Sequence, residues 1–360
     1  MLAPRCLVLA ELNRRRTGVS DTTPRLVTAA AALRGPSVDV LLLGAPGDSD
    51  ALDAAARDAA ALRDVTAVAV AAHPALAGRS PEAAAALLRV LLRRAEPKYT
   101  HLLAAAPATG VRAALPRVAG RLGVGCFSGV SAFAGPDTAS RHLFSGSVVA
   151  TARSLDPLLV ANVKTVAFDS APRSRSGPSA PVSRVGAEAL EMLARELVDE
   201  GLPGGQPPRV VVDAPGGADA ATGRQRPELA SAEVVVSGGR GLKTADRFHA
   251  AERLADALGA AVGASRGAVD LGIATPDMQV GQTGVTVAPR LYFALGISGA
   301  AQHVAGMCDS GAIIAINTDA RAPIYDVADY GLVSDAGAAA AELADALGAG
   351  SGPSQVKSAK

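Results

Sequence analysis

Glycine-rich turns that also carry cations, hydroxyls and amides follow one apolar run after another between Val234 and Asp335. Glycine lets a backbone approach a ligand closely, and a helix that begins directly after such a turn favours negative charge at its N-terminus. Because parallel strands end at one edge of a sheet, the set predicts an edge that holds an extended, phosphate-bearing ligand. The turns are Ser237–Gly241, Gly263–Arg266, Val280–Gly284, Gly296–His303 and Ala315–Asn317.

Two arginines in these turns are candidates for contact with an anionic or aromatic ligand. Arg240 lies between an apolar strand and a helix, where phosphate binds in many proteins, and Arg266 closes a turn of small residues. A guanidinium group stacks on a ring or pairs with a developing anion. The competing interpretations are a tight strand–helix turn at Arg240 and a surface ion pair at Arg266.

Neutral polar side chains in the other turns extend the predicted site. Thr283 can donate a hydrogen bond to a ring nitrogen or oxygen, and Ser298 opens a turn whose amides suit a pyrophosphate. His303 and Asn317 follow or end further apolar runs, as Asp335 does. The competing interpretations are a polar turn for Thr283, a structural histidine for His303 and an N-cap of the last helix for Asp335.

The chain lacks the residue patterns of a self-contained catalyst. No Ser-His-Asp arrangement, nucleophile elbow, HExxH motif or Cys–His cluster stands out, and the five histidines show no metal-ligand spacing. A polar site without these catalytic groups is typical of proteins that hold a reactive cofactor and adjust its reactivity. We therefore expect a cofactor-binding protein that has no metal and no substrate turnover of its own.

Composition excludes several classes of protein. The formal net charge of +1 over 360 residues gives no electrostatic case for nucleic acid. No apolar run reaches the roughly 18 residues of a membrane span, so we expect no membrane insertion. Three widely spaced cysteines predict neither a disulfide framework nor a zinc site, and the N-terminus runs directly into a predicted strand. We expect a cytoplasmic protein.

The chain divides into two α/β domains. Residues 1–185 alternate strand-like and helix-like segments, which predicts a parallel sheet covered by helices. Two segments without an intervening helix, Phe144–Ala152 and Leu159–Phe168, predict an antiparallel extension of that sheet. The predicted strands are Cys6–Leu12, Val38–Leu43, Val65–Ala71 and Thr100–Ala105, and the helices lie near Pro24–Leu33, Ala51–Leu62, Pro81–Arg94 and Gly110–Leu122.

A connecting segment at 186–228 separates this domain from a second one at 229–348, and 349–360 has the composition of a frayed tail. Ala171–Pro181 has the composition of a mobile connection, and Gly186–Glu200 has helical periodicity. The second domain is predicted to be a Rossmann-like parallel sheet. Its predicted strands are Val234–Val236, Ala260–Gly263, Val285–Ala288, Tyr292–Ile297, Ala312–Asn317 and Gly331–Val333.

These motifs closely resemble the alpha subunit of electron transfer flavoproteins. The resemblance is densest in the second domain, at Ser237–Lys243, Val262–Arg266, Asp277–Gly284, Gly296–His303 and Val327–Gly331. In the first domain it is looser, at Leu9–Glu11, Thr100–Ala104, Leu115–Val118 and Phe144–Gly146. Most of the chain is covered, and Gly186–Pro227 matches poorly.

The resemblance implies the FAD-binding subunit of a heterodimeric electron carrier. Its second domain would hold one FAD per heterodimer, and a beta subunit would complete the site and hold AMP or a second FAD of its own. Electrons would come from flavin dehydrogenases, such as the acyl-CoA dehydrogenases of fatty acid beta-oxidation. They would pass to a respiratory acceptor such as a membrane quinone reductase.

The resemblance also implies a role for each site residue. Arg240 would lie by the diphosphate, Ser265 beside FAD, and Arg266 against the isoalloxazine ring. His303 would bond the C2 carbonyl, and Thr283 would bond near N5. The implied cofactor-binding set is Arg240, Ser265, Arg266, Val280, Gly281, Gln282, Thr283, Ser298, Gly299, Ala300, Ala301, Gln302, His303, Asn317 and Asp335.

Two other functions stay open from the residues alone. One is a nicotinamide-dependent dehydrogenase that uses the first domain, although the turn after the first strand, Glu11–Arg16, has no glycine fingerprint. The other is a nucleotide-binding regulatory module. Hydride transfer by the isolated chain would support the first, and tight binding of ATP or AMP without flavin would support the second.

Overall fold

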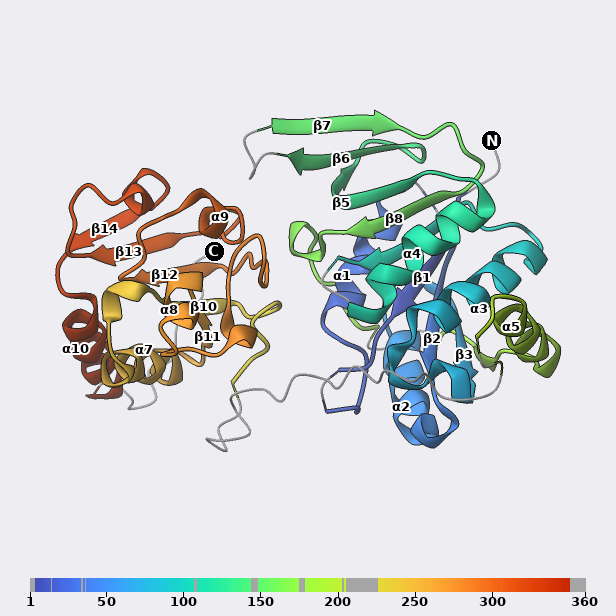
Figure 1. Cartoon of the computed structure of the whole chain (residues 1–360), viewed down its shortest axis with the longest axis horizontal. Helices are drawn as coiled ribbons and strands as arrows, with labels where there is room; N and C mark the ends of the chain where they lie inside the picture. The colour runs from blue at the N-terminus through green and yellow to red at the C-terminus, as the bar shows by residue number, and fades with distance from the viewer. Residues whose placement is uncertain are drawn as a thin grey trace. The chain divides into compact units, whose positions relative to one another are not determined.

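The computed structural model describes residues 4–13, 15–33, 35, 37–106, 109–143, 148–174, 179–202, 204 and 226–349. It divides into two compact units, Met1–Ala214 and Pro215–Lys360 (Figure 1). Each unit is built on its own sheet, of nine strands in the first and five in the second. The α/β fold class that the sequence predicts is confirmed.

The sheet of the first unit has the strand order β7-β6-β5-β8-β4-β1-β2-β3-β9. β1 (Arg5–Ala10) is almost wholly buried, as expected for a central parallel strand that has helices on both faces. β6 and β7 pair antiparallel, and β5 pairs antiparallel with β6. The remaining strands are β2 (Ser37–Gly44), β3 (Val65–Ala72), β4 (His101–Ala105), β5 (Cys126–Phe133), β6 (Thr138–Leu143), β7 (Val148–Arg153), β8 (Leu159–Val163) and β9 (Val182–Arg184).

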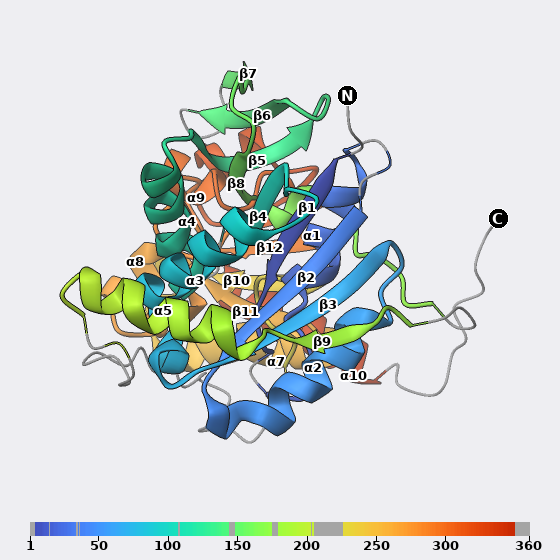
Figure 2. The same ribbon diagram turned by 90° about the vertical axis from the view of Figure 1, so that its right-hand side faces the viewer.

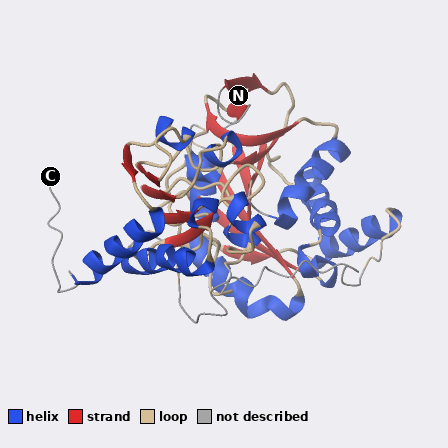
Figure 3. Cartoon of the chain, turned by 60° about the vertical axis from the view of Figure 1, so that its left-hand side comes forward, coloured by secondary structure: helices blue, strands red, loops and turns tan. Residues whose placement is uncertain are grey.

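Alanine-rich and leucine-rich helices cover this sheet, and Figure 3 shows them in blue against the red strands. Small alanine side chains let a helix approach a sheet closely, which suits a chain with only 3% aromatic residues. The helices are α1 (Thr22–Ala31), α2 (Ser49–Ala60), α3 (Pro81–Arg94), α4 (Thr109–Leu122) and α5 (Ala187–Asp199).

One sequence prediction for the first unit is wrong. Leu159–Phe168 does not extend the sheet in the antiparallel sense, because β8 pairs parallel with both β4 and β5. The antiparallel part is instead β5, β6 and β7, and the beginning of the predicted segment Phe144–Ala152 lies outside the described residues. The described ends of Ala171–Pro181 are bound to α2, because the Ser174 and Ala180 amides donate to the Ala61 and Ala60 carbonyls at 2.8 and 3.0 Å.

The helix α5 packs on α3 of the first unit, whereas the sequence pattern placed it in the connecting segment. Leu193 and Leu197 are buried in one cluster with Leu87 of α3, and an ion pair joins Arg89 to Glu196 at 2.5 Å. β9 adds an edge strand beside β3, and Figure 2 shows β9 along that edge and α5 beside α3. The apolar run Val210–Asp213 predicts a short strand, and it lies outside the described residues.

The second unit is a five-stranded, all-parallel sheet in the order β11-β10-β12-β13-β14. One face carries Val236, Phe293 and Leu295 and packs against α7 and α10. The other face carries Val235, Tyr292 and Ala294 and is covered by loops. The strands are β10 (Val234–Gly238), β11 (Ala261–Ala264), β12 (Leu291–Leu295), β13 (Ile313–Asn317) and β14 (Tyr330–Val333).

The helix α7 of this unit begins and ends where its sequence indicates. The Thr244 hydroxyl accepts a hydrogen bond from the Arg247 amide at the start of α7 (Ala245–Leu258), and Gly259 ends the helix in the left-handed region at φ 62°. The other helices are α8 (Arg266–Asp270), α9 (Ala301–Val304) and α10 (Ala336–Ala349). The strand predicted at Val285–Ala288 is wrong, because that segment makes only an isolated bridge from Val285 to Val280.

No helix in the described part of the chain is long and apolar enough to cross a membrane.

Asp335 is the N-cap of α10. Its Oδ1 atom accepts the Ala338 amide at 2.9 Å, and its Oδ2 atom pairs with Arg247 at 3.0 Å. The amide of Ala338, and then the charge of Arg247, lower the pKa of this carboxyl group. Because the pKa is lower in the folded state, the stabilisation is present at neutral pH and is lost as the pH falls through the folded-state pKa.

We predict that Asp335→Ala lowers the local free energy of opening of α10 by about 1 kcal/mol, because a helix loses its side-chain cap. Native-state hydrogen exchange of the α10 amides measures this change. Asp335→Asn keeps an acceptor for the cap and loses only the ion pair, so its effect should stay below about 0.5 kcal/mol. Equal losses in both variants would contradict the capping role.

Candidate functional site

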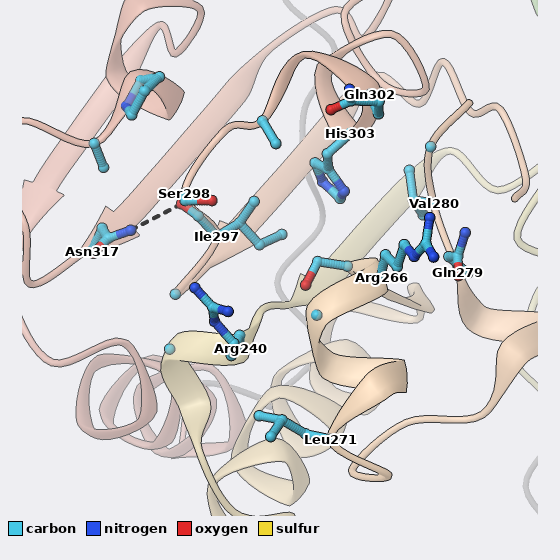
Figure 4. Close-up of a pocket in the computed structure, with 18 of the residues that line it drawn as sticks. Arg240, Arg266, Leu271, Gln279, Val280, Ile297, Ser298, Gln302, His303 and Asn317 are labelled. Atoms are coloured by element: carbon cyan, nitrogen blue, oxygen red, sulfur yellow. Dashed lines mark hydrogen bonds between the residues drawn. The ribbon is translucent and has the colours of Figure 1, made fainter. Parts of the chain in front are cut away.

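A cavity of about 870 Å³ lies at the carboxyl ends of the strands in the second unit (Figure 4). This volume falls within the range of ligand sites in proteins. Its lining comes from the turns after β10, β11, β12 and β13 and from the loop at 279–283. The lining residues are Arg240, Gly241, Lys243, Ser265, Arg266, Gly267, Leu271, Gln279, Val280, Gly281, Gln282, Thr283, Gly296, Ile297, Ser298, Ala300, Gln302, His303, Asn317, Asp319, Ala322 and Pro323.

The strand order explains why the cavity lies here. After β10 the chain adds β11 on one side of it and then returns to add β12 on the other side. The connections that leave β10 and β12 therefore diverge, and the ligand crevice of an open α/β sheet lies at such a reversal. Arg240 follows β10 and Ser298 follows β12, so the two turns border the same crevice.

Glycines allow these two turns to pack against each other. The Gly239 amide donates to the Leu295 carbonyl at 2.8 Å, and the Gly241 amide donates to the Gly296 carbonyl at 3.0 Å. A side chain at Gly239 would collide with the Gly296 carbonyl oxygen, and a Cβ atom at Gly241 would lie 2.7 Å from that oxygen. The glycines of Ser237–Gly241 thus serve close backbone packing, which fixes Arg240 at the cavity.

Three cationic side chains and one carboxylate are among the described residues that line the cavity: Arg240, Lys243, Arg266 and Asp319. Arg266 is the first residue of α8, its side chain is 73% exposed, and its distance to Asp270 is 3.7 Å. An ion pair that is so exposed is worth little, so the guanidinium is available to a ligand. The excess of positive charge favours an anionic ligand.

The hydroxyl groups of Thr283 and Ser265 are held in defined positions. Gln279 Nε2 donates to Thr283 Oγ1 at 2.9 Å, which leaves the Thr283 proton free to donate to a third group. Ser265 Oγ accepts the Ala268 amide at 3.3 Å as the N-cap of α8. The two hydroxyls therefore lie at the cavity with part of their hydrogen-bonding capacity unused.

Asn317 supports the loop that follows β12. Its Nδ2 atom donates to the Ile297 carbonyl at 2.9 Å (Figure 4). Its Oδ1 atom accepts the Asp319 amide at 3.0 Å. Both polar atoms of the side chain thus already have partners within the chain. The position of Ser298, next to Ile297, depends on this support.

His303 lies at the cavity wall and is 7% exposed. Its Nε2 atom is 3.0 Å from the Tyr292 hydroxyl, and its Nδ1 atom is fully buried without a hydrogen bond of good geometry. Burial lowers the pKa of this histidine to about 4, an effect that the nearby Val280 carbonyl partly offsets. The imidazole is therefore neutral at physiological pH.

The structure brings together twelve of the fifteen residues predicted from the sequence. Gly299 and Ala301 belong to the same loop as Ser298 but do not line the cavity, and Gly299 instead lies against the Ile324 backbone at φ 86°. Asp335 does not line it either and caps α10. For Asp335 the structure shows the N-cap role that the sequence also allowed, and a contact between Asp335 and a ligand remains a prediction.

Several lining residues were missed by the sequence reasoning. Lys243 and Gln279 lie inside motifs that were recognised, but no rule of type or spacing singled them out. A positive φ of 66° at Lys243, which is unusual for a residue other than glycine, is a signal that only the backbone reveals. Asp319 follows the end of β13 and Leu271 follows the end of α8, where no sequence pattern predicts that a side chain lines the cavity.

Metal and thiol chemistry find no support in the described ranges. No group of three histidine, cysteine or carboxylate side chains there could hold a metal ion. Cys6, Cys126 and Cys308 are free thiols, and burial raises the pKa of the Cys6 thiol to about 12. The described residues of the cavity include no cysteine and no serine that is hydrogen-bonded to a histidine.

Two family models match the chain. Residues 7–190 match the electron transfer flavoprotein domain, and residues 228–308 match the electron transfer flavoprotein FAD-binding domain. The second match contains the turns after β10, β11 and β12 that form most of the cavity.

Whole-chain relatives agree with these matches. The electron transfer flavoprotein subunit alpha of Pseudomonas aeruginosa is 41% identical over 95% of this chain and 99% of its own length. The subunit alpha of Paracoccus denitrificans is 43% identical over 91% of this chain and 95% of its own length. The mitochondrial subunit alpha of Dictyostelium discoideum is 39% identical over 92% of this chain and 88% of its own length. The chain belongs to the electron transfer flavoprotein alpha-subunit family.

Proposed function

We propose that this chain is the FAD-binding subunit of a heterodimeric electron carrier. It accepts electrons from flavin dehydrogenases, such as the acyl-CoA dehydrogenases of fatty acid beta-oxidation, and passes them to a respiratory acceptor such as a membrane quinone reductase. Family membership supports the carrier role. The relatives are named subunit alpha, which implies a second subunit, and we propose that this beta subunit completes the flavin site.

One observation carries the proposal: cations and neutral donors surround a large cavity whose described residues include no cysteine, no serine hydrogen-bonded to a histidine and no metal cluster. Bound FAD supplies the redox chemistry. The side chains supply positive potential and hydrogen bonds where a reduced flavin carries negative charge. The lining thus fits a dinucleotide that is anionic at its diphosphate and gains charge at its ring.

The positions of the lining residues support contacts with different parts of FAD along the cavity. Arg240 and the turn that begins at Ser298 border the crevice between β10 and β12, which suits the diphosphate. Arg266 is free to lie against the isoalloxazine ring, and Thr283 can donate to it near N5. Asn317 orders the adenosine end indirectly, through its bond to Ile297.

In the first unit, the described residues directly after β1 do not form the dinucleotide-binding turn of a Rossmann fold. The segment after β1 closes on itself, since the Asn13 amide donates to the Gly18 carbonyl at 3.0 Å and Leu12 bridges Val19. It therefore lacks the glycine turn that would bring a pyrophosphate to a helix N-terminus. This arrangement disfavours the nicotinamide-dependent dehydrogenase. The three free thiols suit a reducing compartment, and we propose the cytoplasm.

Co-expression with the beta subunit tests the proposed function. We expect a heterodimer that shows a flavin absorption spectrum and holds one FAD in this chain. Flavin and nucleotide released by denaturation would be counted per heterodimer, which also decides whether the beta subunit holds AMP or a second FAD. A folded, colourless heterodimer would contradict the proposal, as would tight binding of ATP or AMP by this chain alone without flavin.

Arg266→Ala is expected to lower the reduction potential of the flavin, because positive charge near the reduced ring is lost. A tenfold change in the equilibrium corresponds to about 30 mV for the two-electron couple, and we expect a shift of at least that size. Arg290→Ala, which removes an arginine that does not line the cavity, is the matched control. A redox titration in which both variants match the parent would refute the role of Arg266.

Gln279→Leu is expected to weaken FAD binding by about threefold to tenfold, the effect of losing one hydrogen bond that positions Thr283. Equilibrium titration of the flavin-free heterodimer measures the dissociation constant. Thr283→Val should weaken binding by a similar factor, and the double variant should add little to either single change. Fully additive effects would show that Gln279 does not act through Thr283.

A further inference from the structure

One carboxylate lines a cavity whose other charged side chains are cations. Asp319 is the single acidic residue among the described residues of the lining, which also include Arg240, Lys243 and Arg266. The cations suit a diphosphate, whereas a carboxylate repels one, because like charges destabilise each other. An ionised carboxylate accepts hydrogen bonds and donates none. Asp319 therefore suits a different part of the ligand, one that carries a neutral hydrogen-bond donor.

The loop that carries Asp319 is bonded at both of its ends to the turn after β12. At the start of the loop, Asn317 Nδ2 donates to the Ile297 carbonyl at 2.9 Å (Figure 4). At the end of the loop, the Ile324 amide donates to the Ser298 carbonyl at 3.0 Å. Contacts within the chain thus fix the position of Asp319 relative to the turn that we assign to the diphosphate.

The carboxylate of Asp319 is oriented within this loop and keeps unused acceptor capacity. Its Oδ1 atom accepts the Arg321 amide at 2.9 Å, and its own amide donates to Asn317 Oδ1 at 3.0 Å. Its Oδ2 atom has no hydrogen bond or ion pair within the described part of the chain. Since an ionised carboxylate offers about four lone-pair sites, a ligand can donate to Asp319 without breaking a contact of the loop.

The place of Asp319 in the topology indicates which donor it meets. β12 and β13 are parallel neighbours, and their connection contains the turn Gly296–Gly299 and the helix α9. In βαβ units that bind dinucleotides, the turn after the first strand approaches the pyrophosphate, and an acidic residue about 20 positions further on accepts a hydrogen bond from the ribose. Asp319 follows Gly299 by about that interval and lies just beyond the end of β13. The turn lacks the G-x-G-x-x-G spacing, so the comparison rests on the order of the strands.

The polar side chains of Asn317 and Asp335, at the ends of β13 and β14, are already engaged within the chain. Both polar atoms of Asn317 have partners. The Asp335 carboxylate accepts the Ala338 amide and pairs with Arg247. Asp319, in contrast, lines the cavity with one carboxylate oxygen unused by the described residues.

We propose that Asp319 is a specificity-determining residue that accepts a hydrogen bond from a hydroxyl group of the adenosine ribose. It also selects a ribose without a phosphate on those hydroxyls, because such a phosphate would bring further negative charge to the carboxylate. The inference rests on the proposed function, since FAD supplies the adenosine. It assigns to Asp319 a contact that family membership and the matched FAD-binding segment, residues 228–308, do not include.

Analogues of FAD test this contact. FAD and two analogues, whose adenosine lacks the 2′-hydroxyl or the 3′-hydroxyl group, are titrated into the flavin-free heterodimer, and their dissociation constants are compared. We expect at least one analogue to bind the parent about tenfold to a hundredfold more weakly than FAD, the effect of losing one hydrogen bond to a charged group. In Asp319→Ala, FAD should weaken by a similar factor, and the difference between FAD and that analogue should disappear.

Asp309→Ala, which removes an exposed carboxylate that does not line the cavity, should keep the parent's preference for FAD over the analogue. A preference that persists unchanged in Asp319→Ala would overturn the proposal, because the residue would then act only on the loop. A parent that binds FAD and both analogues equally would overturn it even if the variant fails to fold. A heterodimer that binds no flavin would refute the proposed function and this inference together, whereas equal binding of the three flavins refutes the inference alone.

Discussion

The carboxyl edge of the five-stranded sheet is the constraint on which the site depends. Parallel strands bring the ends of β10, β11, β12 and β13 to one side, and the reversal between β10 and β12 opens the crevice there. Segments from Arg240 to Asn317 thereby meet around one cavity. Without that edge the glycine turns would be unrelated loops.

Close backbone packing converts this edge into a defined surface. Gly239, Gly241 and Gly296 let two turns share hydrogen bonds at a distance that no side chain would permit. Around them, Gln279 holds Thr283, Asn317 holds Ile297 and Tyr292 holds His303. The residues that meet the cavity are thus positioned by partners behind them, as preorganised electrostatic stabilisation requires.

The sequence could predict the elements whose periodicity and caps are local. The strand β12 and the helix α7, with its cap Thr244 and its end at Gly259, follow from short-range patterns. Pairing partners that lie far apart in the chain cannot be predicted from local patterns, so the sequence predicts an antiparallel strand where β8 pairs parallel with β4. Val285–Ala288 has the composition of a strand, but the Val285 amide and carbonyl bond to the loop around Val280, and the Val287 amide donates to the Gly306 carbonyl.

The residues of the candidate site also divide into those that a local sequence pattern predicts and those that depend on contacts far apart in the chain. Polar residues directly after apolar runs, such as Arg240 and Thr283, were found because the end of a strand predicts its place at the edge. Tyr292 could not be found, since a tyrosine within an apolar run is indistinguishable from core until its hydroxyl is seen against His303. Asp335, like Asn317, is a polar residue after an apolar run, yet its carboxylate accepts a hydrogen bond from the Ala338 amide at the start of α10.

The most direct test of the central claim is an experimental structure of the heterodimer with its flavin. The account predicts FAD at the carboxyl edge of the second sheet, with its diphosphate between the turns after β10 and β12 and its ring between Arg266 and His303. Flavin bound only by the first unit or only by the partner subunit, with this edge empty, would contradict it.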